Sequence, residues 1–266
     1  LASGLLDALL DKGYRYAMTA NSDNLGAAPS ARIAGWFAAS GAPYAPEMCR
    51  RTPADVKGGH LAVRKSDGRI ILRDTAQTPE DQMHYFTDQF RHPFFHTNNL
   101  WFDLKVLRDT LAERGGILGL PLIKNSKTVD PADSASTPVI QLETAMGAAV
   151  EAFEGATAIE VPRSRFLPVK TTNDLLLVRS DVYEVDDDGL LQMVPERACT
   201  VNLDPRFYKK IQDFEARFPE GVPSIKDAQS LTVEGDWTFG SGVVATGEAH
   251  VEAGGSPGRI ADGTRI

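Results

Sequence analysis

Residues 14–27 read YRYAMTANSDNLGA, an apolar and aromatic run that is followed directly by a polar cluster. The first half of this stretch has the residue content of a buried strand. In open α/β sheets, ligands bind just beyond the carboxyl ends of the strands. The stretch therefore predicts a strand that ends at a binding site, with Asn21, Ser22 and Asp23 as candidate site residues.

The segments on either side alternate between helical and extended patterns. A hairpin is expected over residues 56–74, because two apolar runs flank the turn Ser66-Asp67-Gly68. Such an alternation is typical of an α/β domain. The remaining periodic segments predict helices over residues 1–10, 78–90, 103–114, 144–153 and 173–183, and a strand over 156–162.

The pattern changes after about Pro205. The run RFYKKIQDFEARF at 206–218 predicts one helix, and beyond it apolar residues recur every six positions. Six-residue repetition with interspersed glycine favours a parallel β-helix, and a small antiparallel sandwich is the alternative. The two repeating rows are Leu231, Trp237, Val243 and Ala249, and Val233, Phe239, Ala245 and Val251.

Composition excludes several classes of protein. The net charge of −8 argues against a nucleic-acid partner, because such proteins usually present a basic face. The apolar runs are shorter than the roughly 20 residues that cross a bilayer, so no membrane helix is expected. Cys49 and Cys199 show neither disulfide-rich nor zinc-type spacing, which favours a reducing, cytoplasmic setting.

Several motifs together resemble one enzyme family. The most specific is PRSRFLPVKTTNDLLL at 162–177, and it is supported by NSDNLGA at 21–27 and HTNNLW at 96–101. Further matching segments are ADVKGGHL at 54–61, IQLETAMGAA at 140–149 and RFYKKIQDF at 206–214. With these motifs the chain resembles, over nearly its whole length, the eukaryotic-type UTP-glucose-1-phosphate uridylyltransferases, also called UDP-glucose pyrophosphorylases.

The resemblance implies a fold and a reaction. It implies a mostly parallel nucleotidyltransferase sheet of the GT-A or Rossmann-like type in a catalytic domain at residues 1–204. A linking helix and a short left-handed parallel β-helix would then occupy residues 205–266. The reaction would join UTP and glucose 1-phosphate into UDP-glucose and pyrophosphate, with Mg²⁺ as the cofactor.

The resemblance also assigns the residues that act on phosphates. Asp23 matches the aspartate that holds the metal, with capping of the next helix as the alternative. Asn21 and Ser22 match positions that line the sugar phosphate, and a plain turn is their alternative. Lys170 matches the catalytic lysine that contacts the phosphates, whereas an ordinary surface lysine is the other interpretation.

A second group of residues is implied to contact the sugar. Asn98 and Asn99 match asparagines that face glucose, and Gly58 and Gly59 match a place where the backbone approaches the ligand. Asp74 stands where relatives carry a glutamate that reaches sugar hydroxyls, and its side chain is one methylene shorter.

Two nearby arginines have two interpretations. Arg163 and Arg165 either contact substrate or order their loop through a buried carboxylate, for example that of Glu143.

The family's glycine-rich phosphate loop is not found ahead of Tyr14. We therefore expect an N-terminal portion to be missing, and the chain alone to fold poorly and to be inactive. Two alternative functions fit the same pattern. One is a related UDP-sugar pyrophosphorylase that acts on another sugar 1-phosphate, and the other is a non-catalytic assembly protein of the same fold. Self-association into a homo-oligomer is a further prediction, through the exposed edge of the β-helix.

Overall fold

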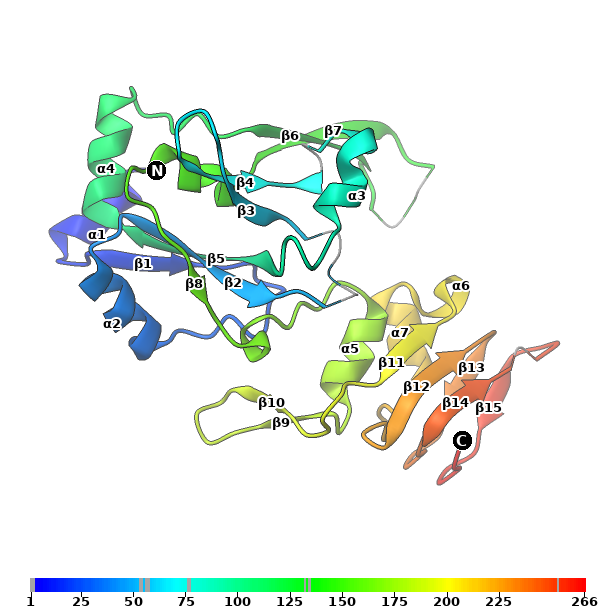
Figure 1. Ribbon diagram of the computed structural model, residues 1–266. Helices are drawn as coiled ribbons and strands as arrows, with labels where there is room; N and C mark the ends of the chain where they lie inside the picture. Colours follow the sequence, from blue (N-terminus) through cyan, green and yellow to red (C-terminus); the bar gives the residue numbers. More distant parts are fainter. Residues whose placement is uncertain are drawn as a thin grey trace. The chain divides into compact units, whose positions relative to one another are not determined.

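The computed structural model describes residues 3–52, 55, 58–75, 78–131, 133, 135–252 and 254–266. The chain forms two compact units (Figure 1). Unit 1 comprises Leu1–Ser22 and Ala27–Phe166, and unit 2 comprises Asp23–Gly26 and Leu167–Ile266. The units thus divide after Phe166, ahead of the expected boundary at residue 204, and the functional limits of the two domains stay a prediction.

Unit 1 contains a mixed sheet with the strand order β1-β5-β2-β8 in its described residues. Strand β5 runs antiparallel to both β1 and β2, whereas β2 and β8 are parallel. The expected α/β class is confirmed. The prediction that the sheet is mostly parallel is wrong for these strands, because β5 lies between β1 and β2 and runs antiparallel to both. The strands span Tyr16–Thr19 (β1), Tyr44–Arg50 (β2), Phe94–Asp103 (β5) and Ile159–Glu160 (β8).

Helices cover both faces of this sheet. The side chains of β5 alternate between the two faces and are apolar on both, so each face needs a covering layer. Leu100 and Phe102 pack on the face covered by α1, α4 and the 3₁₀ helix η4. Trp101 packs on the other face, where it meets Phe37 of α2 at a ring distance of 6.1 Å. The helices span Leu5–Asp11 (α1), Ala31–Ser40 (α2), Leu104–Glu113 (α4) and Met146–Ala152 (η4).

The local predictions for unit 1 are mostly confirmed. The hairpin forms as β3 (His60–Val63) and β4 (Ile70–Arg73), although its expected first residues, 56 and 57, lie outside the described residues, as do residues 1–2 of the first helix. Helix α4 starts after Asp103, whose carboxylate accepts the N–H groups of Lys105 and Val106 at 3.0 and 3.2 Å. The segment 78–90 gives only η3 (Glu80–Gln82) and α3 (Met83–Phe86).

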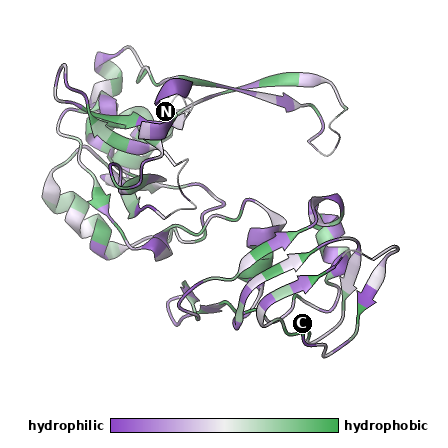
Figure 2. Ribbon diagram, turned by 45° about the vertical axis from the view of Figure 1, so that its right-hand side comes forward, coloured by the Kyte–Doolittle hydropathy of each residue, from purple (hydrophilic) through white to green (hydrophobic). Residues whose placement is uncertain are grey.

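One hairpin of unit 1 was not predicted. Strands β6 (Leu122–Thr128) and β7 (Pro138–Thr144) pair antiparallel and extend as a two-stranded arm (Figure 2). A helix was predicted to begin at residue 144, but Thr144 is the last residue of strand β7. The helical segment η4 begins two residues later, at Met146. The alternation in this hairpin is weak because lysines, asparagine and serine occupy much of β6.

The first part of unit 2 contains short helices. Helix α5 (Thr172–Arg179) ends earlier than predicted, and Tyr183–Val185 (β9) pairs instead with Leu191–Met193 (β10). The single helix expected at 206–218 is wrong: α6 (Pro205–Tyr208) and α7 (Ile211–Arg217) are separate. The break falls at Lys210, whose ψ of 147° is extended rather than helical.

The rest of unit 2 stacks strands in parallel. Strand β12 (Ala228–Val233) lies between β11 (Thr200–Leu203) and β14 (Gly247–Val251), and both pairings are parallel. Strands β13 (Trp237–Phe239) and β15 (Gly258–Ile260) are also parallel neighbours. The antiparallel sandwich is therefore wrong for these strands.

The two six-residue rows form the interior of this stack. Leu231 of β12 is level with Ala249 of β14, and Val233 is level with Val251. All members of the two rows are buried except Trp237, which is partly buried and whose ring packs against Gly258. The periodicity in the sequence thus identified the core of unit 2.

Among the described residues, no helix has the length and apolar content needed to cross a bilayer.

Truncating the stack's interior should be costly. Phe239 has 0% exposure, so Phe239→Ala should lower the free energy of unfolding by about 3–5 kcal/mol through lost burial and a cavity. Phe90 is 89% exposed, so Phe90→Ala should change it by less than about 0.5 kcal/mol. Urea denaturation of both variants checks this, and equal midpoints would contradict the assigned core.

Candidate functional site

The backbone of unit 2 brings the two predicted phosphate-site residues together. Asn24 and Pro168 form an isolated antiparallel bridge. The N–H of Val169 donates to the carbonyl of Asp23 at 2.9 Å, which places Asp23 beside the residue that precedes Lys170. Segments about 140 positions apart in the sequence therefore lie side by side.

The side chain of Asn24 reinforces this pairing. Its Oδ1 accepts the N–H of Leu167 at 2.8 Å and that of Gly26 at 3.2 Å, and the residue is buried. The N–H of Leu25 also donates to the carbonyl of Leu167 at 3.0 Å. Asn24 was not among the predicted residues, because nothing in NSDNLGA distinguishes a structural asparagine from one that binds a ligand.

Asp23 does not cap the helix that follows it. The N-cap of α2 is Ser30, whose Oγ accepts the N–H of Ile33 at 3.3 Å. The partly exposed carboxylate of Asp23 has no hydrogen bond or ion pair with the part of the chain that the structure describes. The capping alternative is therefore wrong, and this carboxylate is available for a cation.

Lys170 lies at the start of α5. Its backbone N–H donates to Oδ2 of Asp174 at 3.0 Å, and Thr171 and Asp174 form a capping box. The side chain of Lys170 is exposed and makes no ion pair with any described residue. A capped helix start therefore fixes its backbone while the ammonium group stays accessible.

In unit 1, a residue predicted to line the sugar phosphate contacts one predicted to face the sugar. Nδ2 of Asn98 donates to Oδ1 of Asn21 at 2.7 Å. Asn98 has φ of 62°, the left-handed region that asparagine tolerates better than most residues. Its backbone N–H donates to Nδ1 of His96 at 3.0 Å, which holds the backbone in this conformation.

Gly58 and Gly59 lie where the backbone passes closely over side chains of unit 1. A Cβ at Gly58 would lie 3.1 Å from Cβ of Phe95, and one at Gly59 would lie 3.1 Å from Oδ2 of Asp74. The carbonyl of Gly59 also accepts the N–H of His96 at 2.7 Å. These contacts bring Gly59 and Asp74 together, and they explain both glycines without a ligand, so ligand contact by these residues stays a prediction.

Asn99 lies in the interior. It has 0% exposure, and its Nδ2 donates to Oε2 of Glu47 at 3.0 Å and to the carbonyl of Arg165 at 3.3 Å. Ser22, by contrast, is exposed. The predicted sugar contact of Asn99 is untested, but its amide donor is already used within the protein.

Glu47 is the central residue of this buried network. Its carboxylate accepts from Nε and Nη2 of Arg165 at 2.7 and 2.8 Å, and from Nε1 of Trp101 at 2.9 Å. The suggestion that Glu143 orders the arginine loop is wrong, because Asn125 binds Glu143 on the exposed β6–β7 arm. The sequence offered one signal for Glu47: a lone carboxylate within the apolar strand YAPEMC.

Arg163 has a different partner. Its guanidinium binds both carboxylate oxygens of Asp55, at 2.6 and 3.0 Å. Burial raises the pKa of Asp55, but hydrogen bonds from Arg163 and Thr52 outweigh it and lower the pKa below its usual range. Both arginines of the PRSRF segment therefore order the loop through carboxylates.

The family model described as UTP–glucose-1-phosphate uridylyltransferase matches residues 1–245. The chain belongs to this family. Among its relatives, the UTP–glucose-1-phosphate uridylyltransferase of Solanum tuberosum is 42% identical over 255 residues, which cover 94% of this chain and 51% of that protein. That of Saccharomyces cerevisiae is 39% identical and covers 92% and 48%. The chain thus spans about half the length of these relatives.

Solved structures of the family share the fold. A mutant UDP-glucose pyrophosphorylase of Leishmania major in complex with UDP-glucose matches at 44% identity and a TM-score of 0.84, over 99% of this chain and 58% of that one. A UDP-glucose phosphorylase of Trypanosoma brucei matches at 42% identity and a TM-score of 0.86, over 99% and 57%. The family membership therefore rests on sequence and structure together.

Removing the central carboxylate should destabilise unit 1. Glu47→Ala leaves Arg165 mostly buried without its partner, which should cost about 3–5 kcal/mol of unfolding free energy. The matched control is Glu160→Ala, because Glu160 forms an exposed pair with Arg50 that contributes at most about 1 kcal/mol. Denaturation of the two variants tests this, and similar losses would mean that Glu47 is not the centre of the network.

Stability should fall in acid because two imidazoles are neutral in the fold. Burial and the charges of His92 and Arg51 lower the pKa of His60 to about 3, and burial lowers that of His96 to about 4. In the unfolded chain histidine titrates near pH 6.5, at about the usual pKa. As pH falls from there toward about 3, the unfolded state binds more protons and unfolding becomes easier.

Denaturation at stepped pH values measures this dependence. His60→Phe should reduce the slope of unfolding free energy against pH across this window, whereas the exposed His84→Gln should keep it. An unchanged slope in His60→Phe would contradict the buried neutral imidazole.

Proposed function

We propose that the chain carries the metal, phosphate and sugar contacts of a UTP–glucose-1-phosphate uridylyltransferase, which forms UDP-glucose and pyrophosphate. One observation supports this proposal: a backbone bond joins Asp23, which matches the family's metal position, to Val169, the residue that precedes the matching lysine, Lys170. Family membership supports the reaction. The UDP-glucose complex of the similar Leishmania major protein supports the product.

The reaction joins two anions, so charge neutralisation is the main requirement. A phosphate oxygen of glucose 1-phosphate attacks the α-phosphorus of UTP, and pyrophosphate leaves with the electrons of the broken P–O bond. In this proposal the ammonium of Lys170 contacts the phosphates and stabilises their developing charge. Its exposed and unpaired state among the described residues leaves it free to do so.

Asp23 would hold Mg²⁺. The described residues include no cluster of three or more metal-binding side chains. A single carboxylate nevertheless fits this ion, because Mg²⁺ commonly takes one or two protein carboxylates, with water and substrate phosphates as its other ligands. When bound, Mg²⁺ would neutralise phosphate charge and help align the reactants.

The sugar would be bound by the polar groups of unit 1. The hydrogen-bonded side chains of Asn21 and Asn98 offer amide groups that can donate to and accept from hydroxyls. Asp74 and Gly59 lie together as a second candidate contact. Asn99 would contribute indirectly. Its hydrogen bond to Glu47 would fix the backbone next to Asn98.

We also propose a left-handed β-helix for the parallel strands β11–β15, a cytoplasmic setting and self-association through the coil edge. The parallel pairing and the six-residue rows support the β-helix.

The buried free thiols of Cys49 and Cys199 fit a reducing compartment. Light scattering of the purified protein tests the association, which a monomer at all concentrations would contradict.

Pyrophosphate release from UTP and glucose 1-phosphate by the full-length protein tests the activity, because the chain alone is expected to be inactive. With Mg²⁺, Lys170→Ala should lower kcat by about 10²–10³-fold, because one positioned charge is lost from the transition state. Asp23→Asn should raise the Mg²⁺ concentration needed for half activity. The exposed Lys209→Ala is the matched control and should leave the rate unchanged.

The same assay separates the alternatives. Preferred turnover of another sugar 1-phosphate in competition would favour a related UDP-sugar pyrophosphorylase. Calorimetry supplies the second measurement: if neither UTP nor UDP-glucose binds in the presence of Mg²⁺, a non-catalytic assembly role replaces the enzyme.

A further inference from the structure

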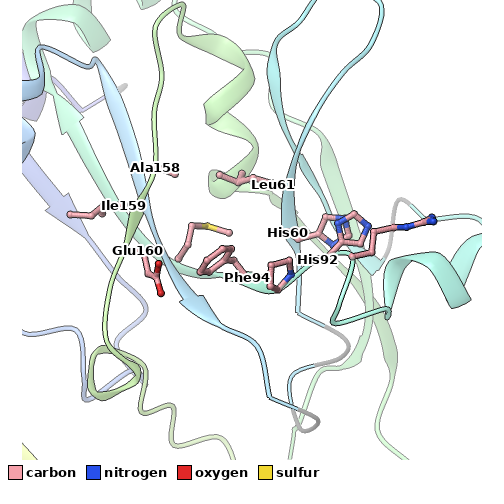
Figure 3. A pocket seen from close by; sticks show the side chains of 10 residues that line it. His60, Leu61, His92, Phe94, Ala158, Ile159 and Glu160 are labelled. Atoms are coloured by element: carbon pink, nitrogen blue, oxygen red, sulfur yellow. The ribbon is translucent and has the colours of Figure 1, made fainter.

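Unit 1 contains a cavity of ≈ 390 Å³ that none of the predicted site residues lines (Figure 3). In Figure 3, Ala158, Ile159 and Glu160 lie on one side, and His60 and His92 lie together on the other. Between them are mostly apolar side chains. Met48, Leu61, Pro93 and Phe94 complete this apolar part, and Arg91 lies beside His92.

The histidine side of the cavity contains buried polar groups without partners. His60 is only 1% exposed, yet neither of its ring nitrogens has a hydrogen-bond partner among the described residues. Its ring stacks on that of His92 at 3.7 Å and 13°. Nε of the buried Arg51, which does not itself line the cavity but whose charge acts on His60, is likewise without a partner in the described part of the chain. Such groups cost free energy unless something binds them.

Positive charge gathers at the same place. Arg51 and Arg73 are close enough to His60 for their charges to lower its pKa, and Arg91 acts on His92 in the same way. None of these three guanidinium groups forms an ion pair in the described part of the chain, although the net charge is −8. Arg51 binds two backbone carbonyls, and Arg73 binds the side-chain oxygen of Gln82.

The acidic groups nearby are already bound. Asp88 accepts the backbone N–H groups of Phe90 and Arg91, and Glu160 pairs with Arg50. The charge of Asp88 acts on His92, and that of Asp55, which is bound by Arg163, acts on Arg51. These two carboxylates offset part of the positive charge, but neither forms an ion pair with Arg51, Arg73 or Arg91 among the described residues.

We propose that this cavity binds a small organic anion, with a phosphate-type head at the imidazole and arginine side and an apolar body against Met48, Leu61 and Phe94. An oxyanion would accept hydrogen bonds from His60 and from the guanidinium of Arg91, and it would offset the local positive charge. The apolar wall would bury the body of the ligand. This site does not depend on the proposed catalytic function.

Titration with phenyl phosphate and with inorganic phosphate tests the proposal. Binding is followed by NMR through the histidine ring protons of the purified protein. Saturable shifts of the His60 and His92 signals are expected, with phenyl phosphate binding more tightly than inorganic phosphate. Arg91→Gln, at an exposed position, should weaken both by about tenfold, the usual effect of losing one charge-assisted hydrogen bond.

Arg108→Gln is the matched control, because Arg108 is an exposed arginine on α4 that pairs with Asp109. It should leave both affinities unchanged. No saturable shift with either probe, or equal weakening by Arg91→Gln and Arg108→Gln, would overturn the anion site. Equal affinity for both probes would overturn the role of the apolar wall.

Discussion

Glu47 has no exposed surface, and its carboxylate binds Arg165, Asn99 and Trp101. These residues come from β2, β5 and the turn that follows β8, so a single buried charge joins three separate parts of unit 1. A buried carboxylate is tolerated only where its partners compensate for lost hydration. The strands and the PRSRF turn therefore have one compatible arrangement, and Arg165 extends it to the carbonyl of Ala28 at 2.9 Å.

The candidate site depends on that arrangement within unit 1. Asn99 is fixed by Glu47, and its neighbour Asn98 adopts a left-handed backbone that His96 supports. This conformation directs the amide of Asn98 to Asn21, which ends the segment after β1. Strain at a single residue is maintained when the surroundings determine it, and such residues concentrate at functional sites. The conformation of Asn98, the proposed sugar contact, is thus maintained by hydrogen bonds within the protein and does not require a bound ligand.

Sequence patterns predicted much of the fold because local signals were strong. The turn at Gly68, the helix expected over residues 103–114 and the six-residue rows each depend on near neighbours, and each was found where expected. The antiparallel direction of β5 and the β6–β7 arm depend on pairings between distant or weakly patterned segments. Nothing in a strand's own residues specifies which neighbour reverses it, and so these features were missed.

The candidate site was likewise predicted only in part. Motif resemblance selected Asp23 and Lys170, and in the structure the backbone of Asp23 bonds to Val169, the residue before Lys170. Motif resemblance did not distinguish residues that would contact a ligand from those that support them, as Asn24, Glu47 and Asn99 illustrate. All are polar residues beside or within apolar segments, and only the partner across the fold distinguishes their roles.

The stacked strands of unit 2 also limit how this protein can change during evolution. Leu231 is level with Ala249 and Val233 with Val251, so equivalent positions recur after one complete circuit of the chain. An insertion of one residue within a strand would turn the interior side chains beyond it outward. Gain or loss of a whole circuit would keep every inward position inward, and insertions at the corners would be absorbed there. Natural length variants of this region should accordingly differ by complete circuits or by additions at the bends.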